Sequence, residues 1–408
     1  MYTTYQALPG CLRHAIIDPV HLQVSRLCAT GKDEVCIANG PFLYRVKVAE
    51  RIQAAMTLKG DQVEKKVVQA DDFISFYSRE CLDTGALSPL QSVVAGPTQD
   101  SVYSVDGGGA VRIHSVSNSS SSSGSSNSSS SSSSNDDDDD DDGGGGGAEW
   151  SSRDISEETR IMSTEGGTDT RSCGWAGLTV DKGEICSVHS MSHGIHFYDT
   201  EKEKAKRSLI CAASPTAICA NAMAQTNMPI HIVGEGGFLS IWDSRTSAGC
   251  SGRYALDAHD VIWSCTMKNN TEVLAAGSEK QVYVFDMRKA RPVAKWNTPS
   301  KFPIISLLPS TSAGEKMYLA GHDNELMCMD PSQMAQFQSD AKKRDLHEMH
   351  DAGKLHLSYN RGIRSKAHWM GLDIVCNADN EDRILGVCAS GNLYAIDYAN
   401  RMELAQFV

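Results

Sequence analysis

The segment IHIVGEGGFLSIWDSR (230–245) decides the fold of this 408-residue chain. It contains an apolar run, a glycine-rich stretch, and a second apolar run that ends in Trp242-Asp243. Two apolar runs of strand length around a short glycine-rich turn predict a β-hairpin. Two later segments repeat the pattern, VLAAGSEKQVYVFDMR (273–288) and MYLAGHDNELMCMD (317–330).

The hairpins recur with a period of about 44 residues. Counting in this period finds four more units: EVCIANGPFLYRVK (34–47), SVYSVDGGGAVRIHS (101–115), EICSVHSMSHGIHFYD (184–199) and RILGVCASGNLYAID (383–397). The seven units end at equivalent positions, which are Lys47, Ser115, Asp199, Asp243, Asp286, Asp330 and Asp397. A repeat of this length is typical of folds in which like units stack on one another.

Two columns of the alignment support the repeat. Four positions before each end stands an aliphatic residue: Leu43, Val111, Ile195, Leu239, Val282, Leu326 and Leu393. Seven positions before each end stand Gly40, Gly108, Ser192, Gly236, Glu279, Asp323 and Ser390. Most members of the second column favour tight turns. The columns therefore predict a turn and the strand that follows it in every unit.

Further strand candidates lie between the hairpins, at 206–212, 253–258, 261–267, 292–297 and 304–308, which makes four strands per period. One four-stranded sheet cannot bury both of its faces, but radial stacking of such sheets covers them. We predict an all-β fold, one seven-bladed β-propeller over residues 1–408. Six blades would follow if the first unit is not a blade. The last blade is completed by either MELAQFV (402–408) or part of residues 1–20.

Here the sequence resembles the WD40-repeat family. The resemblance rests on the period, on Trp242-Asp243 with Arg245, on Phe285-Asp286 with Arg288, and on Tyr198-Asp199. It implies a propeller that binds other proteins. His259 stands where members of that family often place a histidine before the innermost strand. Trp242 and the aspartates 199, 243, 286, 330 and 397 are thus the predicted structural repeat positions, and we expect each carboxylate to bond nearby turn amides at a strand end.

Composition and charge exclude several other classes of protein. The chain is 40% hydrophobic and 22% charged, which is ordinary for a soluble protein. Its net charge is −13, and seven of its acids form one run at 136–142. This balance makes direct nucleic-acid binding through a broad basic surface unexpected. Thirteen cysteines without a CxxC pair, no secretory signal and no long apolar run favour a cytoplasmic or nuclear protein without membrane insertion.

Long inserts interrupt the repeat. The insert at 117–170 is rich in Ser, Asp and Gly, and we expect it to be largely disordered because it cannot bury apolar area. It is either a tolerated expansion or an acidic tether for a basic partner. The insert at 331–364 has apolar residues near helical spacing and a basic stretch, Lys342, Lys343 and Arg344. Those three residues mark a possible interaction helix, or one that lies on its own propeller. A third insert spans 50–80.

No reactive constellation emerges from the motifs. His189, His193 and His196 lie across one hairpin, and His347 with His350 on a weak helix, but neither group has regular metal-ligand spacing. The glycine stretches lack the lysine and helix of a phosphate loop. We therefore expect no catalytic residue, cofactor, metal or small-molecule substrate.

These observations favour a non-enzymatic scaffold or adaptor, a subunit of a multiprotein complex whose partners are other proteins. Fold alone does not decide this, since some propellers are enzymes. One alternative is a subunit of a nuclear-pore, RNA-processing or chromatin assembly that works close to nucleic acid. Another is a propeller hydrolase, with site residues from loops such as His259-Asp260 or His322-Asp323.

Overall fold

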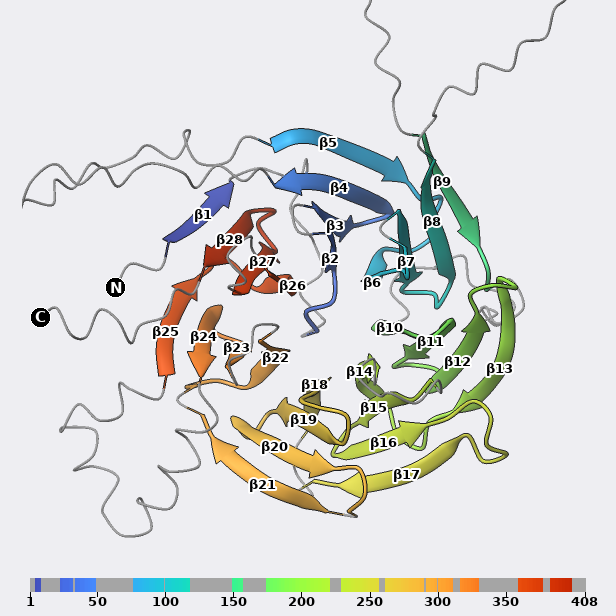
Figure 1. Cartoon of the computed structure of the whole chain (residues 1–408), viewed down its shortest axis with the longest axis vertical. Coiled ribbons are helices and arrows are strands. Elements are labelled where there is room, and N and C mark those ends of the chain that lie inside the picture. Colours follow the sequence, from blue (N-terminus) through green and yellow to red (C-terminus); the bar gives the residue numbers. More distant parts are fainter. Residues whose placement is uncertain are drawn as a thin grey trace, which may run out of the picture.

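A computed structural model gives the structure of the chain. It describes residues 4–8, 23–31, 34–48, 76–98, 100–117, 149–156, 174–220, 229–256, 261–289, 291–298, 300–310, 316–329, 359–376 and 382–397. These residues form 28 β-strands and no helix. The strands make seven separate four-stranded antiparallel sheets, which stand as blades around a ring (Figure 1). The predicted all-β fold with seven blades is confirmed.

Blades 1 to 6 are each built from four successive strands, from the centre outward, and blade 7 from three successive strands and β1. The innermost strands of blades 1 to 7 are β2 (Leu27–Gly31), β6 (Leu90–Ala95), β10 (Ala176–Asp181), β14 (Pro215–Ala220), β18 (Ile262–Met267), β22 (Ile304–Pro309) and β26 (Trp369–Cys376). The second strands are β3 (Glu34–Asn39), β7 (Ser101–Asp106), β11 (Glu184–His189), β15 (His231–Glu235), β19 (Glu272–Gly277), β23 (Met317–Gly321) and β27 (Asp382–Cys388).

The third strands are β4 (Phe42–Val48), β8 (Val111–Ser117), β12 (Gly194–Asp199), β16 (Phe238–Trp242), β20 (Gln281–Asp286), β24 (Glu325–Met329) and β28 (Leu393–Asp397). The outermost strands of blades 1 to 6 are β5 (Phe76–Asp83), β9 (Glu149–Asp154), β13 (Lys204–Ile210), β17 (Cys250–Ala255), β21 (Pro292–Asn297) and β25 (Tyr359–Arg364), and blade 7 takes β1 (Thr4–Leu8). Both alignment columns fall in their predicted places: every turn position lies between a second and a third strand, and all seven aliphatic residues are buried on third strands.

Neighbouring blades cover each other's faces. The buried apolar residues form seven clusters, and each cluster draws its members from two adjacent blades. Between blades 5 and 6, for example, Val282 and Trp296 share one cluster with Leu319 and Met327. Because buried apolar area contributes about 25 cal/mol per Å², these interfaces stabilise sheets that could not hide both faces alone.

The N-terminal strand closes the ring. β1 pairs antiparallel with β28 over five residue pairs, from Thr4 opposite Asp397 to Leu8 opposite Leu393. Of the two predicted ways to complete the last blade, the structure therefore uses the segment within residues 1–20. The other segment, 402–408, lies outside the described residues.

Each of the three long inserts begins after a third strand, and the range 117–170 continues past β9 into the connection to β10. They join β4 to β5, β8 to β9 and β24 to β25. β9 lies inside the range 117–170 and β25 at the end of the range 331–364, so both ranges contribute an outermost strand to their blades. The residues between, including Lys342, Lys343 and Arg344, lie outside the described ranges.

Removal of residues 1–8 tests the closure. Without β1, the amides of β28 on its outer edge lose their partners, so their hydrogen-exchange protection should drop, and the thermal midpoint should fall by several degrees. Hydrogen exchange with mass spectrometry reports the peptide that contains Leu393–Asp397. A peptide from β16, in blade 4 on the far side of the ring, is the internal control. Unchanged protection of β28 would show that β1 does not hold the last blade.

Candidate interaction face

One face of the disc carries all seven turns between second and third strands, because consecutive strands alternate in direction. The same face carries the connections from each outermost strand to the next blade. We call it the turn face, and define it by the turns 40–41, 107–110, 190–193, 236–237, 278–280, 322–324 and 389–392 and the connections 84–89, 211–214, 300–303 and 365–368.

A short polar segment, residues 23–26, crosses the centre of the ring next to this face. It is the dark blue trace that leads into β2 in Figure 1. The Gln23 Nε2 donates to the carbonyl of Thr216 in blade 4 at 3.1 Å, and the Arg26 amide donates to the carbonyl of Met370 in blade 7 at 3.0 Å. Between them, the Ser25 hydroxyl donates to the carbonyl of Gln91 in blade 2 at 2.9 Å.

The acceptors in these three bonds are the unpaired residues of β-bulges. The innermost strands of blades 2, 4, 5, 6 and 7 share a register shift at their second residue. That residue has no partner in the pairing with the second strand; in these five blades it is Gln91, Thr216, Trp263, Ile305 and Met370. A bulge removes one residue from the ladder, so its carbonyl needs another partner. The segment 23–26 supplies that partner in three blades and so ties opposite sides of the ring together.

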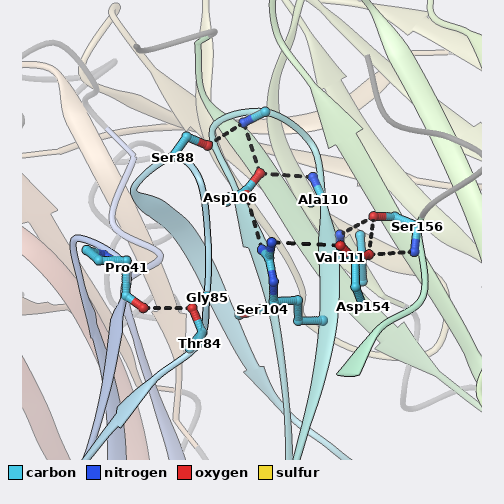
Figure 2. Close-up of polar contacts among 12 residues, drawn as sticks. Pro41, Thr84, Gly85, Ser88, Ser104, Asp106, Ala110, Val111, Asp154 and Ser156 are labelled. Carbon is cyan, nitrogen blue, oxygen red and sulfur yellow. Dashed lines mark hydrogen bonds and ion pairs between the residues drawn. The ribbon is translucent and has the colours of Figure 1, made fainter. Parts of the chain in front are cut away.

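A buried carboxylate shapes the turn of blade 2 (Figure 2). Asp106 Oδ1 accepts from the amides of Gly108 at 3.0 Å and Ala110 at 2.9 Å, and its Oδ2 accepts from Arg112 Nη1 at 2.9 Å. The side chains of Asp106 and Arg112 are only 3% and 4% exposed. Because both charges are out of water, each depends on the other to offset its desolvation.

The same network reaches the connection to blade 3. Arg112 Nη2 lies 3.7 Å from Asp154 Oδ2, and Asp154 Oδ1 accepts from the Ser156 hydroxyl at 2.8 Å. The Ser156 Oγ in turn accepts from the amide of Val111 at 2.9 Å (Figure 2). The turn, the third strand and the residues after β9 are thereby fixed to one another.

His189 links the turns of blades 2 and 3. One ring nitrogen, Nε2, lies 3.0 Å from the carbonyl of Gly107, and the other, Nδ1, accepts from the amide of Ser192 at 3.2 Å. A carbonyl can only accept, so Nε2 carries the proton. His196 pairs instead with the Ser208 hydroxyl at 2.9 Å. Within the described residues, no three His, Cys, Asp or Glu side chains converge as metal ligands.

The turn face also carries most of the exposed apolar side chains. Six large apolar residues are exposed in the described part of the chain, and five of them lie on this face or at its rim. Leu87, Met191 and Phe302, which are 74%, 71% and 44% exposed, stand in turns or connections. Phe238 begins β16 and Ile210 ends β13, so both lie at the rim. The bond from the Ser192 amide to His189 fixes the turn that carries Met191, and the Ser300 hydroxyl oxygen, which accepts from the amide of Phe302 at 3.3 Å, fixes the connection that carries Phe302.

The polar pair His322-Asp323, a possible hydrolase site, is occupied by structural contacts. The rings of His322 and His368 lie 4.9 Å apart, and burial lowers the pKa of His322. Asp323 Oδ2 accepts from Arg364 at 3.1 Å. The other pair, His259-Asp260, lies outside the described residues.

Those predicted repeat aspartates that the structure describes lie on the opposite face, at the ends of third strands. Asp199 Oδ1 accepts from the amides of Glu201 and Lys202 at 3.0 Å, and these bonds lower its pKa. Asp243 and Asp286 each accept from the amide and the guanidinium of the arginine two residues later.

The remaining repeat positions have other surroundings. Trp242 is buried, and its indole donates to the Ser240 hydroxyl at 2.8 Å. The backbone of Asp397 ends β28 opposite Arg383, and Asp330 lies outside the described residues.

Sequence reasoning missed the Asp106–Arg112 pair and the exposed apolar group. The only signal for the latter was apolar letters among turn formers, as in HSMSHG (189–194).

Loss of one partner of the buried pair should destabilise the fold strongly. Asp106→Ala leaves the Arg112 guanidinium buried without its carboxylate, and we expect the free energy of unfolding to fall by about 3–5 kcal/mol in urea titrations. Asp106→Ala with Arg112→Met should recover part of the loss. Asp100→Ala, at an exposed site of the same blade, is the control. A loss no larger than that of the control would contradict the assignment.

His114 predicts a pH dependence of stability. It is fully buried with the Ser104 hydroxyl 2.8 Å from its Nε2, and desolvation with the nearby Arg112 charge lowers its pKa from 6.5 to about 3. Between these values the unfolded chain binds one proton more than the folded chain. Stability should therefore fall as the pH drops from about 6.5 toward 3, by about 1.4 kcal/mol per pH unit from this group.

Urea titrations at several pH values test this dependence. In His114→Gln the slope should shrink by one proton, whereas Ser115→Ala, at an exposed site of the same strand, should keep it. Equal slopes in wild type and His114→Gln would rule out the buried imidazole as the source.

The comparisons with known proteins identify the fold alone. No protein-family model and no curated protein matches the chain. None of the residues that the structure describes forms a helix with the length and hydrophobicity that a membrane crossing requires. The chain is similar to one in the structure described as "Crystal Structure of Mitotic Checkpoint Complex", with a TM-score of 0.57 and 12% identity over 98% of this chain and 93% of that one. This chain is a seven-bladed β-propeller that shares its fold with a chain of that complex.

Proposed function

We propose that this protein is a non-enzymatic scaffold or adaptor that holds other proteins on its turn face, as a subunit of a multiprotein complex. The observation that carries the proposal is the exposure of large apolar side chains on that face, with Met191 in a turn and Leu87 and Phe302 in connections between blades. A partner that covers such side chains removes their apolar surface from water. A chain of the same fold in a protein complex supports the proposal.

The energetics suit a protein partner. Full burial of a Leu, Met or Phe side chain contributes about 1.5–3 kcal/mol, and a few such anchors dominate the affinity of most interfaces. The supports of these anchors are bonded to backbone groups of neighbouring blades, as in the contact of His189 with Gly107. A partner therefore meets a surface that is already ordered, which reduces the entropy that binding costs.

The polar groups of this face favour binding over catalysis. A catalytic pair needs side chains free to reach a substrate. Asp106 is saturated by two amides and a guanidinium, and Asp323 is paired with Arg364. On the opposite face, Ser244, Glu184 and His231 lie together, but the serine hydroxyl and the imidazole both contact Glu184. The hydroxyl is therefore not activated by the histidine.

Charge placed among the anchors should remove the partners. In Met191→Glu/Phe302→Glu, two carboxylates would be buried against the partner, and we expect Kd to rise by roughly 100-fold or more. The measurement is quantitative affinity purification of the tagged chain followed by mass spectrometry of stoichiometric components. Ser247→Glu/Ala248→Glu adds the same charge at exposed positions on the opposite face and should keep the complex intact.

Two outcomes would count against the proposal. One is loss of the same components from both variants, which would place the interface elsewhere. The other is purification of wild-type chain alone with turnover of a small ester, which would favour the hydrolase alternative.

A further inference from the structure

Two histidines, His322 and His368, lie side by side on the turn face where blade 6 meets blade 7, at the left of the ring in Figure 1. His322 is in the turn between β23 and β24, and His368 immediately precedes β26. Their ring centroids are 4.9 Å apart, and the ring planes are inclined by 42°. The side chain of His368 is exposed and that of His322 is half-buried, so the pair can be reached from solvent.

The main chain fixes the position of both residues. The carbonyl of Asn324, two residues after His322, accepts from the Ser365 amide at 3.2 Å and from Trp369 Nε1 at 2.9 Å. The turn of blade 6 is thereby bonded to the connection that carries His368. Each histidine also makes a main-chain bond of its own to another loop of this face. The fold therefore sets the distance between the two rings.

The ring nitrogens of this pair have no hydrogen-bond partner within the described residues. Most other histidines of that part of the chain differ in this respect. A ring nitrogen lies within hydrogen-bond distance of a protein group in His114, His189, His196 and His231. An imidazole nitrogen that no protein group engages is left to water or to a ligand.

The protonation state of the pair suits a metal ligand. Burial, together with the charge of His368, lowers the pKa of His322, so its ring is neutral at physiological pH. Neutral imidazole is the form that coordinates a metal ion, through the lone pair of one nitrogen.

The cations near the pair do not oppose a bound cation strongly. Arg364 donates to Asp323 Oδ2 at 3.1 Å and to Glu325 Oε2 at 3.3 Å, so carboxylates offset its charge. Lys366 is exposed, and water and salt screen the charge of an exposed ammonium group.

The distance between the rings matches that of two imidazoles on one metal ion. Zinc–nitrogen bonds are about 2.0–2.1 Å long, and the ligands of a tetrahedral ion are about 109° apart. With about 1.1 Å from a ring nitrogen to the ring centre, two such centroids lie about 5.2 Å apart, close to the 4.9 Å in this structure. Among the residues that the structure describes, no third His, Cys, Asp or Glu joins the pair.

We propose that His322 and His368 together bind one divalent transition-metal ion of the zinc class and so join blades 6 and 7 on the turn face. Imidazole suits Zn²⁺, Cu²⁺ and Ni²⁺, whereas Mg²⁺ and Ca²⁺ prefer oxygen ligands. With two protein ligands the ion keeps further positions, which water fills in the free chain. This site does not depend on the turn face being the interface for other proteins.

Isothermal titration calorimetry of the full chain with Zn²⁺, in a reductant that does not bind metal, tests the proposal. Wild type should bind one more Zn²⁺ than His322→Asn/His368→Asn, and excess Mg²⁺ should not compete. Either single substitution should weaken this site by at least about tenfold, because one of its two protein ligands is lost. His193→Asn/His196→Asn removes two histidines from blade 3 and should keep the site.

Modification of histidines with diethyl pyrocarbonate, followed by mass spectrometry, locates the ion. Zn²⁺ should protect both His322 and His368, while His193 stays reactive. The proposal would be overturned by equal Zn²⁺ stoichiometry in wild type and His322→Asn/His368→Asn, by loss of the site in the blade 3 variant, or by unprotected rings. In each of these cases the two imidazoles would only pack against each other.

Discussion

The structure depends on one constraint: a four-stranded sheet has two apolar faces and cannot bury either by itself. Each of the seven buried clusters is shared by two blades, so no blade has a core of its own. The second and third strands are most affected, because each is flanked by strands within its blade and by neighbouring blades on both faces. That is why the column from Leu43 to Leu393 accepts only aliphatic residues, each no more than 2% exposed.

Closure of the ring depends on hydrogen bonds to main-chain groups. The N-terminal part of the chain makes such bonds both at the rim and at the centre of the ring. At the rim, β1 supplies the partner that β28 would otherwise lack. At the centre, residues 23–26 meet carbonyls that the bulges of blades 2, 4 and 7 release from their ladders. A bulge increases the local twist of its strand, and the innermost strands of five blades carry one at the same position. In three of these blades the bulge thus provides an acceptor for the segment that crosses the centre.

The repeat could be predicted from sequence because it rests on period and polarity, which are local properties. The glycine-rich turn at Gly236 and the strand from Phe238 to Trp242 can be predicted from the sixteen residues 230–245 alone. The Asp106–Arg112 pair is not, because DGGGAVR (106–112) looks like any turn followed by a strand, and the burial that gives the pair its meaning comes from Ser156 and blade 3. The exposure of Met191 is not evident from sequence either, since an apolar residue normally indicates core.

The strand-end column shows how loop length and sequence depend on each other. Where the link to the outermost strand is short, in blades 3, 4 and 5, the column holds Asp199, Asp243 and Asp286, and each carboxylate bonds the amides that fold that link. In blades 1 and 2 the link is a long insert, and Lys47 and Ser115 take the position, whereas blade 6 has Asp330 there in spite of its long insert. A tight turn needs an acceptor for its amides, and a long insert does not impose that turn. All three inserts leave from that face, whereas every turn between a second and a third strand is short. The turn face keeps its short turns, and with them the rigid geometry that holds its apolar side chains in position.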